Sequence, residues 1–244
     1  MSAAEFLVSP GEITSESKTF TLAGDEGRHA ATVKRMRAGE VINLCDGKGI
    51  RAIATVTKVN KHSIDVDISK VSFEEAPEPK FVVVQALAKG ERAELAVEML
   101  TEVGADAIIP WKAEHSIGKW DADGKGLEKW RRTSRESAKQ SRRAWIPEIS
   151  GLHTTQQICE LMSQAQSVFV LHESADQALA ACAIREQGTI MIVVGPEGGI
   201  SPDELAAFAT AGARVVHMGA SVMRTSTAGA IAVGGLLMRS QRWS

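Results

Sequence analysis

The chain contains no tyrosine, and aromatic residues make up only 5% of its 244 residues. It therefore offers no obvious aromatic platform on which a nucleic-acid base would stack. Cysteine is also scarce, because Cys45, Cys159 and Cys182 are scattered and form no Cys-x-x-Cys pair. This spacing argues against a disulfide framework or a zinc site and fits reduced thiols in a cytosol. We expect no bound metal.

Long apolar runs are missing as well. The first twelve residues lack the basic start and apolar stretch of a signal peptide. The longest apolar helical segment, residues 228–238, is too short to span a bilayer. We therefore expect a cytoplasmic protein with no membrane partner.

The net charge is only −2, yet basic residues gather in residues 28–37 and 128–143. A charged helix face is often merely solvated, but two such clusters in separate segments are the footprint expected for phosphate contacts. The candidate nucleic-acid-binding residues are Arg28, His29, Lys34, Arg35, Arg37, Lys89, Arg131, Arg132, Arg135, Lys139, Gln140, Arg142 and Arg143.

The periodicity of apolar residues divides the chain in two. Residues 1–72 hold short alternating or β-branched stretches that predict a small β-barrel domain. Residues 73–80 are acidic, contain Pro77 and Pro79, and are typical of a linker. From residue 81 to 244 strands and helices alternate, which predicts a mostly parallel sheet with helices on both faces.

The expected elements can be placed along the chain. In the first domain we expect strands at 41–44, 52–59 and 63–68. In the second we expect strands at 81–87, 107–110, 168–171, 190–194 and 213–216, and helices at 91–103, 121–141, 154–165, 175–186 and 229–239. Thr154 and Gln157 form a capping box for one of these helices.

Residues 190–204, IMIVVGPEGGISPDE, join a strand to a helix through glycines. The apolar run at 190–194 is typical of a buried strand. Ser201, Pro202 and Glu204 predict a helix start with an N-cap, a first-turn proline and a capping box. Ligands of parallel α/β sheets bind beyond the carboxyl ends of the strands, where glycines let the backbone approach them.

This glycine loop departs from the G-x-G-x-x-G pattern and lacks the Lys-Ser/Thr pair of a P-loop. Its Glu197 would repel phosphates, so a nucleotide polyphosphate is disfavoured. The loop is better suited to a cationic or hydroxyl-rich ligand.

A second loop follows another short strand and precedes a helix rich in small residues. The two loops, GPEGGISPDE and MGASVMRTSTA, resemble the cofactor-binding motifs of the SPOUT methyltransferases, most closely those of the ribosomal RNA small subunit methyltransferase E family. Three upstream segments agree with that family in the same order, so the resemblance covers nearly the whole chain. They are RHAATVKRMRAGEVINLCDGKG, QALAKGERAELAVEMLTEVGADAIIP and ESAKQSRRAWIPEI.

The resemblance implies a fold, an activity and partners. The fold is a PUA-like β-barrel RNA-binding domain followed by a SPOUT-type knotted sheet, with a C-terminal trefoil knot that general topology rules would not produce. The activity is methyl transfer from S-adenosylmethionine to N3 of a uridine in 16S ribosomal RNA. The implied partners are that RNA or the small ribosomal subunit, and a second copy of the chain in a homodimer.

It also implies the residues of the site. Arg224 is the candidate for stabilising the uracil anion that forms when N3 loses its proton. Glu197 would hydrogen-bond the cofactor, hold Arg224 or accept that proton, and His172 has the residue type of a base. The family has Glu where this chain has Ser226, which we expect to cap the following helix instead. The candidate cofactor-binding residues are Leu171, His172, Glu173, Gly195, Pro196, Glu197, Gly198, Gly199, Met218, Gly219, Val222, Met223, Arg224 and Ser226.

Two other classes of protein stay open. One is a non-catalytic RNA-binding protein with a degenerate methyltransferase domain, which would fail to bind S-adenosylmethionine. The other is a different nucleotide-using α/β enzyme, which would bind NAD or ATP instead. The intact GPEGG loop and Arg-Thr pair weigh against both.

Overall fold

The computed structural model describes residues 3–120 and 124–243. They form two compact units, and each is built from two stretches of chain. The first unit takes Met1–Ala76 and Ala138–Ile146, and the second takes Pro77–Ser137 and Pro147–Ser244. The chain thus returns to the first unit at Ala138, a return that local periodicity does not signal.

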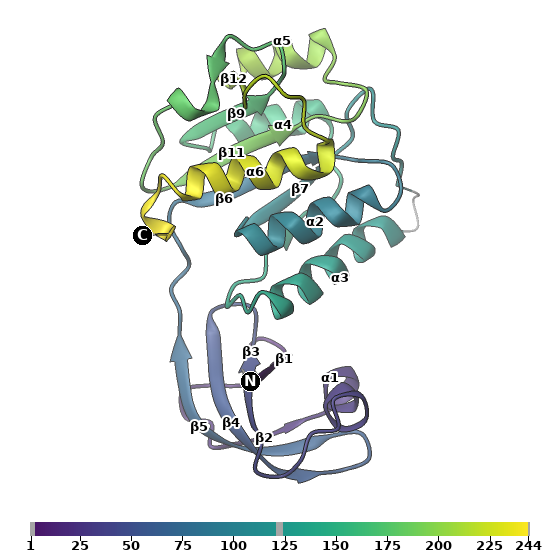
Figure 1. The fold of residues 1–244 in the computed structure, drawn as a ribbon, viewed down its shortest axis with the longest axis vertical. Coiled ribbons are helices and arrows are strands. Elements are labelled where there is room, and N and C mark those ends of the chain that lie inside the picture. The colour runs from purple at the N-terminus through teal and green to yellow at the C-terminus, as the bar shows by residue number, and fades with distance from the viewer. Residues whose placement is uncertain (1–2, 121–123, 244) are drawn as a thin grey trace. The chain divides into compact units, whose positions relative to one another are not determined.

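The first unit is built on a five-stranded sheet in the order β1-β3-β4-β5-β2 (Figure 1). Neighbouring strands are antiparallel except for β1, which runs parallel to β3. The three longer strands confirm the expected ones, while the two four-residue strands were too short for their pattern to predict. The elements are β1 (Ala4–Leu7), β2 (Thr19–Leu22), the helix α1 (Gly24–Arg28), the π-helix η1 (His29–Val33), β3 (Val41–Cys45), β4 (Ile50–Val59) and β5 (Ile64–Phe73).

The returning segment is bonded into this unit around Gly49. The Gly49 N–H donates to the Ala144 carbonyl at 3.0 Å, and the Trp145 indole N–H donates to the Glu74 carbonyl at 2.9 Å. Gly49 has a φ of +101°, and a Cβ there would lie 2.6 Å from that Glu74 oxygen and 2.9 Å from the Trp145 ring. A side chain at position 49 would therefore push the segment away.

The second unit contains a seven-stranded sheet in the order β10-β12-β9-β11-β6-β7-β8, and every neighbouring pair is parallel. This confirms the expected parallel architecture. The strands are β6 (Lys80–Ala86), β7 (Ala107–Trp111), β8 (Glu148–Ile149), β9 (Ser167–Leu171), β10 (Gln177–Ala178), β11 (Thr189–Val194) and β12 (Arg214–His217).

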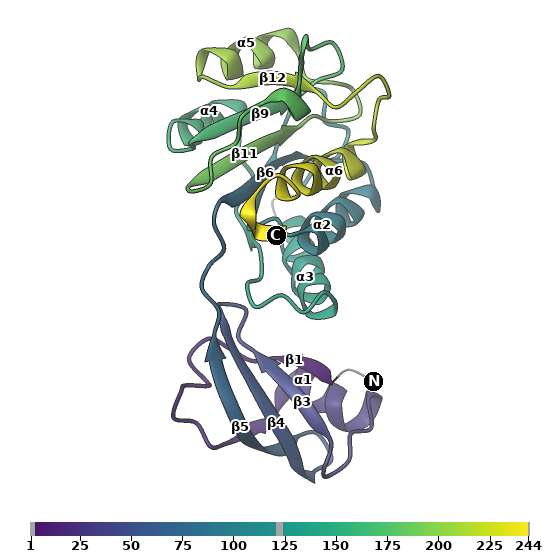
Figure 2. The same cartoon turned by 60° about the vertical axis from the view of Figure 1, so that its left-hand side comes forward.

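Helices cover both faces of this sheet. The helices α2 (Arg92–Val103) and α6 (Thr225–Leu237) lie side by side on one face, with α3 (Lys125–Gln140) beyond α2 (Figures 1 and 2). The helices α4 (Thr155–Met162) and α5 (Pro202–Thr210) cover the other face. The unit is therefore a three-layer α/β/α sandwich.

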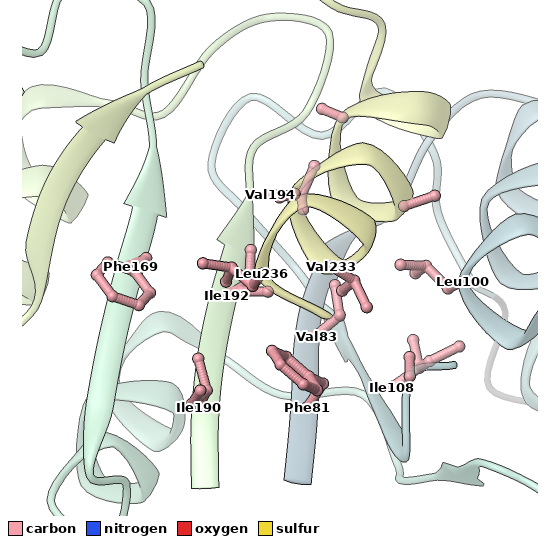
Figure 3. Close-up of a cluster of buried hydrophobic side chains, with 14 of the residues drawn as sticks. Phe81, Val83, Leu100, Ile108, Phe169, Ile190, Ile192, Val194, Val233 and Leu236 are labelled. Atoms are coloured by element: carbon pink, nitrogen blue, oxygen red, sulfur yellow. The ribbon is translucent and has the colours of Figure 1, made fainter. Parts of the chain in front are cut away.

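Alternation along the central strands divides the buried side chains between two cores. In β11, Ile190, Ile192 and Val194 face α2 and α6, whereas Met191 and Val193 face α4 and α5. Figure 3 shows the first of these cores, where Val233 and Leu236 of α6 meet the sheet. Strands buried on both faces read as unbroken apolar runs, which is why this strand was easy to predict.

Several helix boundaries match the sequence. Helix α2 ends at Gly104, whose φ of +116° is the left-handed conformation of a C-cap. Both expected capping boxes are present, Thr154 with Gln157 and Ser201 with Glu204. Helix α3 begins at Lys125, and residues 121–123 of the expected helix lie outside the described residues.

The helix expected at 175–186 is wrong. That segment forms the short strand β10 and a single 3-10 turn, η2 (Leu179–Ala181). Its carbonyls are used by side chains from elsewhere, since the Arg239 guanidinium donates to the carbonyls of Leu179 and Cys182. Tertiary contacts thus override the helix propensity of an alanine-rich sequence.

No helix among residues 3–120 and 124–243 is long and apolar enough to cross a membrane.

All three cysteines are free, and burial raises the pKa of the Cys45 thiol. Within the same residues, no group of three or more His, Cys, Asp or Glu side chains is arranged to hold a metal ion.

Candidate functional site

The candidate site lies at the carboxyl ends of three adjacent strands in the second unit. Strand β9 is the middle one, and its last residue, Leu171, pairs with Val194 of β11 and with Val216 of β12. The three strands therefore end at the same level. The loops that leave them surround a cavity of about 510 Å³.

The structure brings almost all candidate cofactor-binding residues to this cavity. Every one of them lines it except Ser226. The cavity is also lined by residues that the motifs did not indicate, and among those that the structure describes Arg92 is the only charged one. The others are Val194, Ile200, Ala220, Ser221, Thr225 and Ala228.

Ser226 does not cap the last helix. Helix α6 begins at Thr225, four residues earlier than expected, so Ser226 lies in its first turn and is 3% exposed. The N-cap is Arg224, whose carbonyl accepts the Thr227 and Ala228 N–H groups at 2.9 Å. No cap hydrogen bond comes from the Arg224 side chain, which leaves the guanidinium available to the cavity.

Glu204 fixes the glycine loop through more than its capping box. Its carboxylate, 6% exposed, accepts the Glu114 N–H and the Thr155 hydroxyl at 2.9 Å each and the Ser201 N–H at 3.2 Å. The start of α5, the start of α4 and the loop after β7 are thus tied to one side chain. The capping pattern predicted only the contact with Ser201.

Gly198 allows a close approach between two protein segments. A Cβ at this position would lie 2.8 Å from the Cβ of His115. The His115 ring Nδ1 lies 3.2 Å from the Gly199 carbonyl oxygen. Because Gly198 has no side chain, the glycine loop can pack against residues 113–118. The same lack of a side chain also lets a ligand approach the backbone.

Two arginines and two carboxylates line the cavity. Glu197 is exposed, and its Oε1 lies 3.4 Å from the Lys89 backbone N–H, which donates to it. Arg224 is also exposed, and within residues 3–120 and 124–243 its side chain makes no hydrogen bond or ion pair, with Glu197 or any other residue. The remaining charged lining residues are Glu173 and Arg92.

His172 has one ring nitrogen engaged in a turn. The Ser174 N–H donates to His172 Nδ1 at 3.2 Å, so in the neutral ring the proton sits on Nε2. A local contact of this kind is typical of a histidine that stabilises a turn. It leaves only Nε2 for any contact with a ligand.

Gln85 lies beneath the start of α6 and was missed in the sequence. It is 1% exposed, and its Nε2 lies 3.4 Å from the Thr225 carbonyl, next to Arg224. Its Oε1 has no hydrogen-bond partner among the described residues. A buried amide in an apolar strand is costly, which indicates a role in holding the helix start.

The candidate nucleic-acid-binding residues fall into both units. Those from 28–37 and 139–143 belong to the first unit, whereas Lys89, Arg131, Arg132 and Arg135 belong to the second. Lys34, Arg35 and Arg37 are exposed.

The side chain of Lys139 is largely buried within the first unit. Its Nζ lies 2.7 Å from a Glu26 carboxylate oxygen and 5.3 Å from the centroid of the Phe6 ring. Its side chain is only 10% exposed. The charge of Lys139 is therefore used inside the first unit, which a count of basic residues along the sequence does not reveal.

Comparison with known proteins identifies both units. A family model described as an RNA methyltransferase domain matches residues 74–237, and one described as an RNA methyltransferase PUA domain matches residues 22–69. Ribosomal RNA small subunit methyltransferase E of Mycobacterium bovis is 44% identical over 226 residues, covering 90% of this chain and 86% of the relative. The protein of the same name from Bacillus subtilis is 27% identical over 236 residues, covering 93% and 92%.

Solved structures agree in fold. A methyltransferase from Legionella pneumophila in complex with the bound cofactor SAM has a TM-score of 0.89 and 25% identity, covering 98% of this chain and 99% of that one. Ribosomal RNA small subunit methyltransferase E from Neisseria gonorrhoeae, bound to S-adenosyl methionine, has a TM-score of 0.85 at 24% identity, with 98% of each chain covered. The expected fold class is confirmed, a PUA-like domain followed by a SPOUT-type parallel sheet, while the trefoil knot stays a prediction.

We predict that Glu204→Gln lowers the free energy of unfolding by about 1.5–3 kcal/mol, the range for hydrogen bonds to a charged group. The amide keeps one acceptor oxygen but turns an NH₂ group toward donors. Urea denaturation measures the change. The neighbouring Asp203→Asn is the control, because Asp203 is exposed and we expect it to cost less than about 1 kcal/mol. Equal losses in both variants would contradict the role given to Glu204.

Proposed function

Because this chain belongs to the ribosomal RNA small subunit methyltransferase E family, we propose that it transfers the methyl group of S-adenosylmethionine to N3 of a uridine in 16S ribosomal RNA. The observation that carries the proposal is the cavity at the ends of β9, β11 and β12. Both motif loops line it, and they include Arg224, whose side chain has no partner among the described residues. A ribosomal RNA substrate also places the reaction in the cytoplasm.

The lining of the cavity fits S-adenosylmethionine. Its volume of about 510 Å³ is within the roughly 300–1,000 Å³ of small-molecule sites. Glu173 and Glu197 bring negative charge toward the sulfonium and ammonium groups of that molecule. Apolar side chains suit its adenine ring, and they come from Leu171, Met218, Val222 and Met223.

The bound donor supplies an electrophilic methyl group on sulfur. The protein must therefore supply an acceptor that is oriented and deprotonated. As the N3–H bond of uracil breaks, negative charge develops on the ring, and a new N3–CH₃ bond then replaces the S–CH₃ bond. The Arg224 guanidinium is always charged and offers five N–H donors to that developing anion.

Glu197 is the carboxylate we propose as the acceptor of the N3 proton. It lies on the glycine loop, is exposed to the cavity, and accepts a long hydrogen bond from the Lys89 N–H. Since it is not paired with Arg224, its carboxylate stays open to a proton donor that is bound in the cavity.

The central experiment is methylation of 16S ribosomal RNA by the purified protein, followed by mass spectrometry of the nucleosides. We expect 3-methyluridine to appear with S-adenosylmethionine present and to be absent without it. A methylated nucleoside of another kind would overturn the N3 assignment. Binding of RNA with no affinity for S-adenosylmethionine would instead indicate a non-catalytic RNA-binding protein.

We predict that Arg224→Ala lowers kcat about a hundredfold to a thousandfold, the effect of losing one donor to a developing anion. The affinity for S-adenosylmethionine, measured by calorimetry, should stay near wild type, because Arg224 acts on the transition state. Arg224→Lys should recover little, since an ammonium does not reproduce the guanidinium fork. A loss of cofactor affinity in proportion to the loss of rate would make Arg224 a structural part of the cavity.

We propose that the exposed basic residues contact RNA phosphates, with those of residues 28–37 carrying the contribution of the first unit. Lys34→Glu combined with Arg37→Glu should weaken RNA binding and reduce its salt dependence, because fewer counterions are released. Lys61→Glu, an exposed change in the same unit outside both basic segments, is the control. An unaltered salt slope in the double variant would exclude these two side chains as phosphate contacts.

We also propose that α6 takes part in a homodimer. Ile231 and Met238 are exposed apolar side chains, 49% and 76% accessible, on the same face of the helix as the exposed Gly235. Leu95 of the adjacent α2 is exposed as well. An apolar face of this kind on a soluble domain marks an interaction surface, and sedimentation of Ile231→Asp should then show a monomer where the wild type is a dimer.

A further inference from the structure

The cavity contains a second arginine that neither motif loop supplies. Arg92 is the first residue of α2, in the loop-to-helix junction that follows β6. It lines the same cavity as Arg224, and among the described residues these two are the only Lys or Arg side chains that do so. It was absent from the candidate site residues because nothing in the sequence around it marks a ligand-binding loop.

Arg92 has no partner within the described part of the chain. It is exposed, and it makes neither a hydrogen bond nor an ion pair with another described residue through its side chain. Positions three and four residues further along α2 hold Leu95 and Ala96, which offer no charge to pair with. The acid of the first turn, Glu94, pairs instead with Lys129 at 3.0 Å.

The placement of Arg92 is also unfavourable for the helix itself. The amino end of a helix carries a partial positive charge, so a cation in its first turn is repelled, whereas an acid would be favoured. A residue that breaks a local rule without a compensating contact points to a requirement outside the fold. In this chain the compensating contact is available in the cavity.

On the basis of the function proposed above, we propose that Arg92 binds an oxyanion at this cavity. Arginine holds carboxylates and phosphates through paired N–H donors in a planar fork. The two ligands of the reaction offer one such group each. These are the carboxylate of the methionine part of the donor and the phosphate adjoining the target uridine.

Charge balance supports this assignment. Glu173 and Glu197 in the lining match the two positive groups of S-adenosylmethionine. The developing uracil anion needs Arg224, which leaves the donor carboxylate or an RNA phosphate without a cation unless Arg92 serves it. Without Arg92, Arg224 alone would have to neutralise both the uracil anion and the donor carboxylate or RNA phosphate.

The test compares wild type with Arg92→Gln and Arg92→Lys by calorimetry and by RNA methylation kinetics. If the oxyanion is the donor carboxylate, Arg92→Gln should weaken S-adenosylmethionine binding roughly tenfold or more, the size of a lost charge-assisted hydrogen bond. Decarboxylated S-adenosylmethionine should then bind wild type and variant equally. Arg92→Lys should recover part of the affinity, because the charge is kept.

If the oxyanion is an RNA phosphate, calorimetry with S-adenosylmethionine should give the same affinity in both proteins. The KM for RNA should rise instead, and the slope of log affinity against log salt should fall by about one. Arg185→Gln removes an exposed arginine that does not line this cavity and is the matched control. We expect it to leave both measurements unchanged.

Two results would overturn the inference. One is an Arg92→Gln variant equal to wild type in donor affinity, RNA KM and salt slope. The other is an equal loss of affinity for the donor and its decarboxylated form, which would mean that the cavity itself has changed shape. Failure of the proposed function is separate, because it appears in the wild type as an absence of donor binding or of 3-methyluridine.

Discussion

The candidate site depends on the hydrogen bonds to one buried carboxylate, that of Glu204. It joins α5 to the loop after β7 through the Glu114 N–H, and to α4 through the Thr155 hydroxyl. That hydroxyl in turn accepts the Trp111 indole N–H at 3.1 Å. Losing the carboxylate would leave one buried donor, the Ser201 N–H, and two part-buried donors without their acceptor at once. The glycine loop keeps its shape because this network fixes the helix that follows it.

Strand register determines where the chemistry takes place. Leu171, Val194 and Val216 lie level at the ends of three parallel strands, so the three loops that follow converge on one cavity. On the α6 side, Gln85 at the end of β6 donates to the Thr225 carbonyl and so holds the first turn of the helix beside Arg224. The sheet thus sets the position of the loops, and a buried amide fixes the helix that presents the guanidinium.

The parts that could be predicted from sequence are those whose signals are local. The unbroken apolar run of β11, the Ser201–Glu204 capping box and the two motif loops each lie within a few residues. What could not be predicted depends on distant partners. Lys139 looked like a phosphate-binding residue until the structure paired it with Glu26. The alanine-rich segment 175–186 looked helical, but the guanidinium of Arg239, just after α6, donates to two of its carbonyls. Arg92 reaches the cavity from a helix that no ligand-binding pattern marks.

The separation of Glu197 from Arg224 has a chemical consequence. Had they formed an ion pair, each would already be engaged by the other and less available to the proton and the anion of the proposed reaction. Instead Glu197 accepts a backbone N–H from Lys89, and Arg224 makes its helix-capping contacts through its carbonyl alone. Neither side chain is therefore engaged by the other at the cavity. In the proposed reaction the two side chains can therefore act on different groups, Glu197 on the N3 proton and Arg224 on the anion that its loss leaves.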